Sequence, residues 1–313
     1  MTKKVTVRIS NEIGNQLFMY ASSYAIASKL ERILQLDNET AFSSSKNISK
    51  YGLNNFTISS VIADKNNKFL GFYGYLKRKI LKKINLFSKK KIFYIEPKDR
   101  NKITNFSDEI YNLNLSNNVY LEGYFESEKY FKNIDHIIRQ EFKFIDAEKY
   151  KKSPFFNVIN KKNSVSICLR QNRYTEGKNK NIKSNQDKSE NFKLEQINYI
   201  NKSIDYIKKI IKNPIFYLWS NDLENIDMSL FNSSLIKIIH DQKFITNLDR
   251  RSLDLFLISQ CNHHIVIPSS FNWWGAWLSE KEDKIICRPN DSFFTNFKVN
   301  NLDFWPSNWK VVP

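Results

Sequence analysis

The sequence predicts an α/β protein with two domains, and three observations lead to that prediction. The chain has 313 residues, more than one ordinary hydrophobic core accommodates, and this length suits two domains of roughly 150 residues each. Hydrophobic residues make up 41% of the chain, and glycine and proline are scarce at 7 each, which is typical of a globular protein with a sizeable core. Strand-like and helix-like segments alternate, which favours parallel sheets covered by helices.

The first elements are a strand, a helix and a second strand. Residues 4–10 alternate apolar and polar side chains as a strand does, and residues 15–30 carry apolar and small side chains at helical spacing. Residues 32–37 supply the next strand. A parallel βαβ unit is therefore expected, because crossovers of this kind are right-handed and return the chain beside its first strand. Residues 41–118 show a weaker pattern.

One basic segment, residues 77–91, stands out within that weaker region. Ile80, Ile84 and Phe87 share one face of the helix expected there, and lysines dominate the remaining positions. Two interpretations stay open. The segment is either a solvated surface helix packed on the core, or a helix that makes peripheral contact with an anionic membrane.

The second half of the chain predicts a doubly wound α/β domain. A helix-like segment at residues 131–142 and a polar stretch lead to Pro154, and we expect domains of residues 1–153 and 154–313. The alternating pattern beyond this boundary predicts strands at residues 164–170, 215–220, 235–240, 264–268 and 284–288, and helices at residues 194–211, 253–261 and 269–279. Residues 177–188 have low complexity and predict a mobile polar loop.

Composition and charge exclude several classes of protein. The net charge of +17 is diffuse, and the signatures of RNA-binding modules and zinc fingers are missing, so nucleic acid is not an expected partner. No apolar run approaches the ~20 residues of a membrane-spanning helix, and the first four residues lead directly into a strand, so we expect a cytoplasmic protein. The three cysteines stand in separate apolar runs and are expected to be buried, reduced thiols: Cys168, Cys261 and Cys287.

Polar residues follow several expected strands, at the edge where open α/β sheets bind ligands. Gly14 and Asn15 lie at the turn into the first helix, where free N–H groups face a ligand, although Asn15 also suits a helix cap. Arg170 suits either a bidentate grip on phosphate or a salt bridge at the rim. Residues 217–225 end another strand with polar groups.

Residues 253–278 are the most informative segment. Asp254 stands at the start of one expected helix, and Ser269 and Ser270 cap the next, so N–H groups and hydroxyls there predict an anion site. No P-loop, zinc-ligand spacing or Asp-x-Asp pair occurs, so a diphosphate depends on basic side chains and helix dipoles. Structural roles are favoured for five bulky or basic residues of this segment: His263, His264, Trp273, Trp274 and Trp277.

Four segments together resemble glycosyltransferase family 11, the α1,2-fucosyltransferases of bacterial O-antigen and oligosaccharide synthesis. They are NEIGNQLFMYA, LEGYFESEKYF, YLWSNDLENI and HHIVIPSSFNWWGAWL, which look like the GGLGNQ-type, GYFQ-type, FSDD-type and NSSFSWWGAWL-type motifs of the family. The match is in order and nearly full length. The resemblance implies a GT-B-like fold of two Rossmann-like domains facing a central cleft. It also implies an N-terminal acceptor-side domain, a C-terminal GDP-sugar-binding domain, and an inverting reaction without a divalent metal.

The resemblance further implies roles for single residues. Arg170 binds the β-phosphate of GDP, Asp254 the guanine edge and Ser270 a phosphate, while Asn15 lies near the phosphate or the acceptor. Other donor contacts are implied at matching positions of the motifs: Gly14, Gln16, Arg173, Tyr174, Ser220, Asn221, Asp222, Ser269 and Phe271.

The chain departs from the family pattern in two places. The usual HxRRGDY segment is CLRQNRY here, so Arg173 either restores the lost positive charge from a shifted position or accompanies a different donor or acceptor. The leading glycine pair of the first motif is Asn-Glu here, which makes Glu12 a candidate acceptor contact or base. Asp222 and Glu176 are the other candidate bases, and a loose transition state needs little base assistance.

The sequence thus predicts transfer of L-fucose from GDP-fucose to a galactose 2-hydroxyl of a bacterial surface glycan, such as the O-antigen of lipopolysaccharide. Two alternatives stay open. One is another GDP-sugar as donor, because of the altered segment after Arg170, and the other is a non-catalytic protein that binds a glycan or a membrane surface. A lipid-linked acceptor would place the protein peripherally on the cytoplasmic face of the inner membrane.

Overall fold

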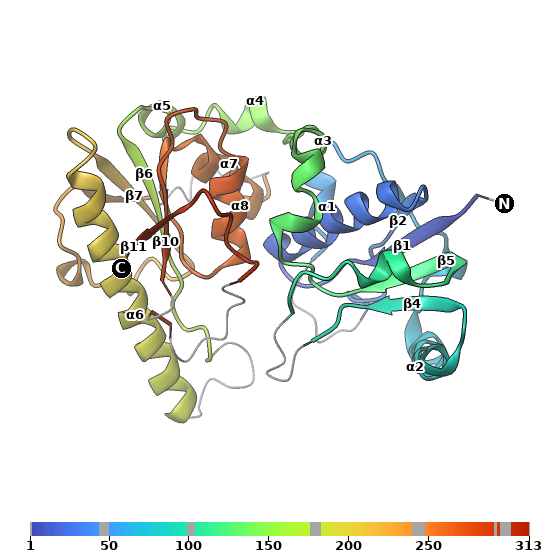
Figure 1. Cartoon of the computed structure of the whole chain (residues 1–313). Coiled ribbons are helices and arrows are strands. Elements are labelled where there is room, and N and C mark those ends of the chain that lie inside the picture. Colours follow the sequence, from blue (N-terminus) through green and yellow to red (C-terminus); the bar gives the residue numbers. More distant parts are fainter. Residues whose placement is uncertain are drawn as a thin grey trace. The chain divides into compact units, whose positions relative to one another are not determined.

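The computed structural model describes residues 2–43, 50–98, 104–175, 183–239, 248–290, 293–294 and 302–312. The chain divides into two compact units (Figure 1). Unit 1 comprises Met1–Ile145 and Asn300–Trp305, and unit 2 comprises Asp146–Val299 and Pro306–Pro313. The division therefore falls between Ile145 and Asp146 instead of before Pro154, and a short C-terminal segment returns to unit 1. The acceptor-side and donor-side roles of the two domains stay predictions.

The described part of unit 1 is built on a five-stranded parallel sheet in the order β3-β2-β1-β5-β4. The strands are β1 (Lys4–Arg8), β2 (Ile33–Asp37), β3 (Val61–Ile62), β4 (Lys91–Ile95) and β5 (Leu115–Glu122). The predicted βαβ opening is confirmed, since β1 and β2 pair in parallel on either side of α1 (Ile13–Lys29) in the chain. The central strand β1 buries Val5 and Val7 completely.

The weakly patterned region of unit 1 holds elements that the sequence did not reveal. Strands β3 and β4 form the two edges of the sheet, and both residues of β3 are exposed. An edge strand of this kind lacks the alternating apolar pattern that identifies half-buried strands. The basic segment belongs to α2 (Gly71–Phe87). The helix expected at residues 131–142 is shorter, because two 3-10 turns precede α3 (Asp135–Glu141).

The described part of unit 2 is built on a six-stranded parallel sheet in the order β11-β10-β9-β6-β7-β8. The strands are β6 (Ser164–Leu169), β7 (Ile215–Ser220), β8 (Ile236–Ile238), β9 (His263–Ile265), β10 (Ile286–Pro289) and β11 (Lys310–Val312). All six residues of β6 are buried, as expected of a parallel strand covered on both faces. The strand order reverses at β6, which confirms the predicted doubly wound arrangement.

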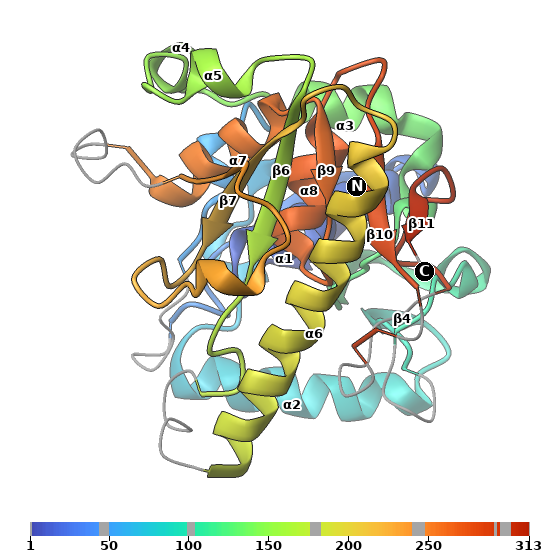
Figure 2. The same cartoon turned by 90° about the vertical axis from the view of Figure 1, so that its left-hand side faces the viewer.

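Helices cover both faces of the unit 2 sheet. Figure 2 shows α6 (Lys183–Lys208) in front of this sheet and α7 (Arg250–Gln260) and α8 (Ser270–Leu278) behind it. Two short helices, α4 (Ala147–Tyr150) and α5 (Phe156–Ile159), precede the first strand. Because α6 begins at Lys183, the loop predicted at residues 177–188 is wrong over its last part. Residues 176–182 lie outside the described residues. Extending a helix by polar residues costs little once its apolar part is packed.

The core behind the unit 2 sheet confirms the structural roles predicted for the tryptophans. Trp273 and Trp274 are fully buried, and the ring planes of Trp273 and Trp277 stack with centroids 6.2 Å apart. Gly275 of α8 lies directly against Ile258 of α7, where any added Cβ would collide with the isoleucine side chain. The segment NWWGAW therefore allows α8 to pack closely against α7.

Buried histidines and cysteines of unit 2 also have structural roles, as predicted. The Nδ1 atom of His264 lies 2.7 Å from the hydroxyl of Ser166, and burial lowers the pKa of His264. The Nε2 atom of His263 lies 3.0 Å from the backbone oxygen of Lys162. All three cysteines are buried, free thiols.

Candidate functional site

Three neighbouring strands of unit 2 end at one edge of the sheet with predicted site residues. Arg170 follows β6, Ser220 ends β7, and β9 leads to Ser269 at the start of α8. Since β9, β6 and β7 are adjacent and parallel, their carboxyl ends share this edge. The strand order reverses between β9 and β6, so Arg170 and Ser269 flank the switch point at which open α/β sheets bind ligands.

Both backbone polar groups of Arg170 are hydrogen-bonded to one side chain. Its N–H donates to Oε1 of Gln196 (2.9 Å), and its carbonyl oxygen accepts from Nε2 of the same amide (2.8 Å). Gln196 is fully buried in α6. The guanidinium therefore starts from a fixed position, which favours a preorganised phosphate contact. Gln196 was not predicted as a site residue from the sequence. A glutamine among the buried positions of a helix nevertheless indicates that its amide has a specific hydrogen-bond partner.

The residues that replace the second arginine and the glycine of the family segment brace β6 against β7. Gln171 is buried, and its side chain donates to the carbonyl oxygen of Asp222 (2.5 Å) and to the hydroxyl of Ser220 (3.3 Å). The amide of Asn221 pairs with both backbone groups of Gln171, at 2.8 and 3.0 Å. Asn172 has a φ of 56°, and asparagine tolerates this left-handed conformation better than most residues.

Asn221 and Asp222, the predicted site residues after β7, both make hydrogen bonds within unit 2. The side chain of Asn221 positions Gln171, and its direct contact with the donor stays a prediction. The carboxylate of Asp222 accepts from the amides of Asn172 (3.0 Å) and Asn225 (3.0 Å). Both bonds are internal to unit 2, and the role of Asp222 as a base stays a prediction. Glu176, another candidate base, lies outside the described residues.

Arg173 and Tyr174 pack against α6. The guanidinium carbon of Arg173 lies 5.4 Å from the ring centroid of Phe192, and the ring of Tyr174 meets the same phenylalanine edge-on at 6.2 Å. The backbone N–H of Tyr174 donates to Ser189 (2.9 Å). A polar pocket of about 430 Å³ lies beside this segment. It is lined by Gln171, Asn172, Thr175, Gln186, Ser189, Glu190 and Lys193.

Asp254 lies one turn further into its helix than predicted. α7 begins at Arg250 and is capped by Asp249, whose carboxylate accepts from the backbone N–H of Ser252 (2.9 Å). The carboxylate of Asp254 is 24% exposed and lies 3.5 Å from Nε of Arg250. Burial raises the pKa of Asp254 to about 6, although the charge of Arg250 opposes this. The carboxylate is thus partly desolvated and suited to accept bonds from N–H groups of a ligand.

Contrary to the prediction from the sequence, the serines at the start of α8 do not cap the helix with their side chains. Ser269 occupies the N-cap position, but its side chain makes no capping hydrogen bond, and Ser270 is already the first helical residue. The carboxamide oxygen of Asn272 instead accepts from the backbone N–H of Ile267 (2.8 Å). Ser269, Ser270 and Phe271 are all partly exposed. The amino end of α8, which carries the positive end of the helix dipole, therefore lies at the same sheet edge as Arg170.

The remaining predicted residues lie in unit 1, where β1 turns into α1. α1 begins at Ile13 with Glu12 in the N-cap position, so Gly14 is helical and Asn15 is not a cap. The left-handed φ of the turn, 62°, falls on Asn11 instead of on glycine. Asn15 donates from Nδ2 to Oε1 of Glu126 (2.8 Å). The unusual turn that was predicted at Gly14 is therefore present three residues earlier, because asparagine also tolerates it.

Gln16 holds this corner together from inside. It is fully buried, and its Nε2 donates to the carbonyl oxygens of Asn11 (2.6 Å) and Lys50 (2.8 Å). Its Oε1 accepts from the N–H of Gly52 (2.9 Å). All these bonds are internal, so Gln16 positions the corner, and its direct contact with the donor stays a prediction.

The GYFQ-like segment after β5 brings further polar groups to this corner. The carboxylate of Glu96 accepts from the N–H groups of Tyr124 (2.7 Å) and Phe125 (2.9 Å), and burial raises the pKa of Glu96 to about 7. The hydroxyl of Tyr124 accepts from Nδ2 of Asn11 (2.5 Å). The sequence analysis missed Tyr124 and Glu126 as site residues, although the motif that contains them was recognised.

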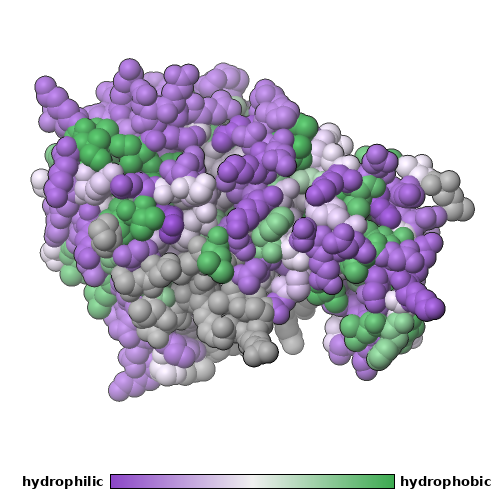
Figure 3. Space-filling view, in the orientation of Figure 1, coloured by the Kyte–Doolittle hydropathy of each residue, from purple (hydrophilic) through white to green (hydrophobic). Residues whose placement is uncertain are grey.

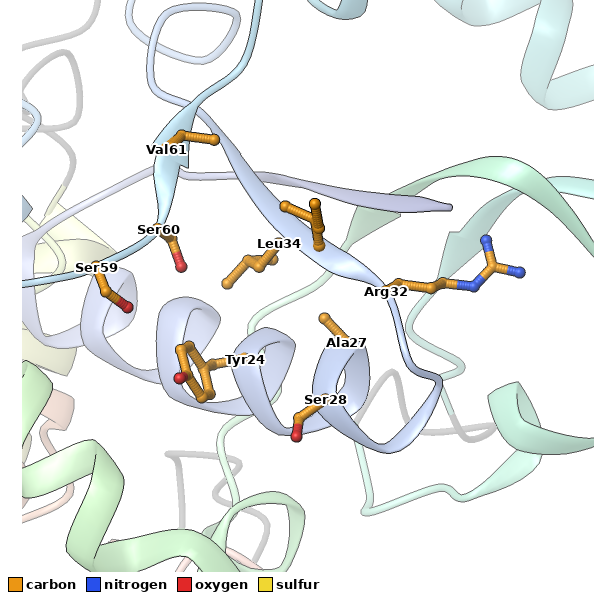
Figure 4. A pocket seen from close by; sticks show the side chains of 9 residues that line it. Tyr24, Ala27, Ser28, Arg32, Leu34, Ser59, Ser60 and Val61 are labelled. Atoms are coloured by element: carbon orange, nitrogen blue, oxygen red, sulfur yellow. The ribbon is translucent and has the colours of Figure 1, made fainter. Parts of the chain in front are cut away.

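Unit 1 has a hollow of its own, of about 320 Å³, and none of the predicted site residues lines it. It lies between α1 and the segment that leads into β3 (Figure 4). Tyr24, Ser59 and Ser60 contribute hydroxyls, whereas the guanidinium of Arg32 points away and donates to the carbonyl oxygen of Ser116 (2.6 Å). None of the described residues that line this hollow directs a charged group into it, so their side chains are a poor fit for a nucleotide.

Among the described residues, no group of three or more His, Cys, Asp or Glu side chains is placed to hold a metal ion. Within the same ranges, the helices are too short or too polar to cross a bilayer.

Comparison with known proteins identifies the family of the chain. The family model described as "Glycosyl transferase family 11" matches residues 1–311. The α-1,2-colitosyltransferase of Escherichia coli is 27% identical over 310 residues, covering 97% of each chain. The O-antigen biosynthesis glycosyltransferase WbnK of Escherichia coli is 25% identical over 315 residues, covering 95% of this chain and 98% of its own.

Among solved structures, the α-1,6-fucosyltransferase NodZ of Bradyrhizobium, soaked with GDP-fucose, is similar with a TM-score of 0.52 and 14% identity. The match covers 89% of this chain and 93% of NodZ. This likeness confirms the predicted GT-B-like α/β fold. The chain belongs to glycosyl transferase family 11 and is a glycosyltransferase.

Proposed function

We propose that the protein transfers L-fucose from GDP-fucose to the 2-hydroxyl of galactose in a bacterial surface glycan such as an O-antigen. The α-1,2 linkage and the O-antigen are supported by the names of the two Escherichia coli relatives, and GDP-fucose by the likeness to NodZ. The observation that carries the proposal is the pairing of Arg170 with the amino end of α8 at the switch point of the unit 2 sheet.

In this proposal the unit 2 edge binds the GDP part of the donor. The guanidinium of Arg170 and the N–H groups at the start of α8 meet the β-phosphate, and Ser269 and Ser270 add hydroxyl bonds. The carboxylate of Asp254 accepts from the N–H groups on the guanine edge. No divalent metal is required, because an arginine and a helix end supply the positive charge at the diphosphate.

The chemical step is an inverting displacement. The bond between the fucose C1 atom and the phosphate oxygen breaks with both electrons going to GDP, while the galactose 2-hydroxyl oxygen attacks C1 from the opposite side. The positive charge at Arg170 and the α8 terminus stabilises the negative charge that develops on the β-phosphate. The proton of the attacking hydroxyl passes to a carboxylate of the protein or to water.

The acceptor contacts belong to unit 1 in this proposal. The corner between β1 and α1 presents the carboxylates of Glu12 and Glu126 and the amide of Asn15. Glu12 is exposed, whereas Asn15 and Glu126 are partly buried and hydrogen-bonded to each other. Amides and carboxylates suit sugar hydroxyls, because they offer paired donors and acceptors. Asn15 therefore orients the acceptor, and Glu12 and Glu126 are the candidates to receive its proton.

A second donor has specific support, because one relative is named as a colitosyltransferase. Colitose is the form of L-fucose that lacks the 3-hydroxyl. The altered residues Gln171 and Asn172 lie beside a polar pocket of about 430 Å³.

The test begins with calorimetric titration of GDP in the presence of EDTA and again with Mg²⁺. The proposal expects binding of equal affinity in both buffers. GDP-fucose, GDP-colitose and GDP-mannose are then compared as donors to galactose-terminated oligosaccharides, with the linkage of any product assigned by NMR. Preferred use of GDP-colitose would replace the donor in the proposal. GDP binding without transfer from any donor would support a non-catalytic protein, and absence of GDP binding would overturn the proposal.

A further inference from the structure

Helix α2 turns its polar side toward unit 1 and its apolar side toward solvent, the reverse of an ordinary surface helix. Of its seventeen residues, Asn85 is the one that is buried. Large apolar side chains on the helix are strongly exposed, with Tyr73 at 85%, Ile80 at 58% and Phe87 at 90%. One of the two interpretations of this segment was a surface helix packed on the core. The helix does contact unit 1, but its apolar face takes no part in that packing.

Polar contacts fix this orientation. The guanidinium of Arg78 bonds both carboxylate oxygens of Glu122 at 2.5 and 2.7 Å, and the ammonium of Lys82 adds a third bond at 2.5 Å. The side chain of Glu122 is only 8% exposed. Asn85 accepts from the N–H groups of Ile92 (2.8 Å) and Phe93 (2.9 Å). A rotation that buried the apolar face would break all these bonds and leave a buried carboxylate without its cations.

Five of the exposed apolar residues of α2 form a stripe along the helix. Its members recur every three or four residues, the spacing that aligns side chains along a helix. They are Tyr73, Leu76, Ile80, Ile84 and Phe87, and we call them the α2 stripe. Figure 3 shows hydrophobic colour gathered over α2 at the lower right, bordered by hydrophilic residues. An exposed apolar surface of this kind marks an interaction site in a water-soluble protein.

The charges around the stripe indicate what covers it. Lys77, Lys79 and Lys83 are exposed on α2, and Lys89 and Lys90 are exposed just beyond its end. The sequence from Lys65 to Ile95 contains no aspartate or glutamate. Two copies of this helix packed together would oppose lysines to lysines, which disfavours a dimer. A surface with dense negative charge and an apolar interior matches both the lysines and the stripe.

We propose that α2 docks the protein on an anionic lipid bilayer, with the α2 stripe inserted at the boundary between head groups and acyl chains. The helix then lies in the plane of the membrane surface, and its lysines contact the phosphates of the lipid head groups. Arg78, Lys82 and Asn85 hold the helix on unit 1 in this orientation. This docking does not depend on which sugar the enzyme transfers.

Flotation of the full-length protein with lipid vesicles tests the proposal. We expect binding to vesicles that contain phosphatidylglycerol and little binding to pure phosphatidylcholine, with partial release at high salt. The double variant Ile80→Ser, Ile84→Ser should bind about tenfold more weakly. A matched control is Leu194→Ser, Ile210→Ser, which removes aliphatic residues of similar exposure from unit 2. Equal binding by both double variants would overturn the proposal.

A charge-reversal pair gives a second, independent arm. Lys77→Glu, Lys79→Glu, Lys83→Glu should abolish binding, whereas Lys208→Glu, Lys209→Glu, Lys212→Glu should keep most of it, since these lysines are exposed in unit 2. Circular dichroism and thermal unfolding check that each variant folds. A dimer in light scattering that the stripe variant dissociates, without vesicle binding, would show a self-interface instead. Transfer to a soluble acceptor should be unchanged in all four variants, so failure of docking and failure of the proposed reaction are separable.

Discussion

Each unit has one sheet edge with candidate site residues, and the two edges differ in charge and in the way their side chains are held. The unit 2 edge is cationic, with Arg170 clamped through its backbone by buried Gln196 and the positive end of α8 on the neighbouring strand. The unit 1 edge holds the carboxylates of Glu12 and Glu126 beside the amide of Asn15. A diphosphate requires the first kind of edge, and the hydroxyls of a sugar acceptor suit the second.

Replacing the arginine tests the cationic edge with the largest expected effect. Arg170→Ala should lower kcat/KM by about a hundredfold to a thousandfold, because it removes the charge that we propose to stabilise the leaving diphosphate. Arg170→Lys should recover part of the loss, since it keeps the charge and loses the bidentate fork. Steady-state kinetics and calorimetry with GDP measure both effects. Turnover near that of the wild type in Arg170→Ala would remove the phosphate role.

A change on the carboxylate edge should separate the two regions. Glu126→Gln should reduce kcat/KM for the acceptor by about tenfold, as expected for loss of a general base or an acceptor contact, and should leave the affinity for GDP unchanged. Glu128→Gln is the matched control, because Glu128 lies two residues further along and is also partly buried. A fall in GDP affinity equal to the fall in acceptor turnover would contradict the division of roles.

The affinity for GDP should depend on pH through Asp254. Burial raises the pKa of this carboxyl to about 6, with Arg250 opposing. Only the ionised carboxylate accepts bonds from two guanine N–H groups, so GDP binding is favoured above this pKa and lost as the pH falls below it. We expect about tenfold weaker binding for each pH unit well below 6. Calorimetry between pH 5 and 8 should show this slope in the wild type and a flat profile in Asp254→Asn.

Stability of unit 1 should carry a smaller pH signature from Glu96. Burial raises the folded-state pKa of this carboxyl to about 7, although two backbone N–H groups oppose the rise. Between its unfolded pKa and 7 the folded state binds more protons than the unfolded state. The contribution of Glu96 is therefore present at low pH and is lost as the pH rises through 7, by up to about 3 kcal/mol.

Urea unfolding at several pH values measures this effect. Between about pH 4.5 and 7 the wild type should lose stability more steeply with rising pH than Glu96→Gln, which has no carboxyl to titrate at this position. The comparison rests on the slopes, because the glutamine also offers one acceptor fewer to the N–H groups of Tyr124 and Phe125. Parallel slopes would mean that Glu96 is already ionised in the folded protein.

Much of the fold follows from local patterns in the chain. The first strand, helix and strand, and the central strands of unit 2, were predicted because a buried strand and an amphipathic helix have distinct apolar spacings. Edge strands β3 and β4 lack that signal, since solvent covers part of each. The polar start of α6 was predicted to be a loop. Residues that become helical by extension of a neighbouring packed segment need no apolar periodicity of their own, so the sequence does not identify them.

The sequence by itself determined the family, the two-domain α/β class and the candidate residues at strand ends, because motifs and apolar periodicity are local properties. Only the tertiary structure showed that Gln16, Gln171 and Asn221 face inward as braces, and that Glu126 meets Asn15. It also decided the orientation of α2, since Glu122, which binds Arg78 and Lys82, lies on β5, far along the chain. Pairings between distant residues depend on how strands are ordered in space, and periodicity within a segment does not report that order.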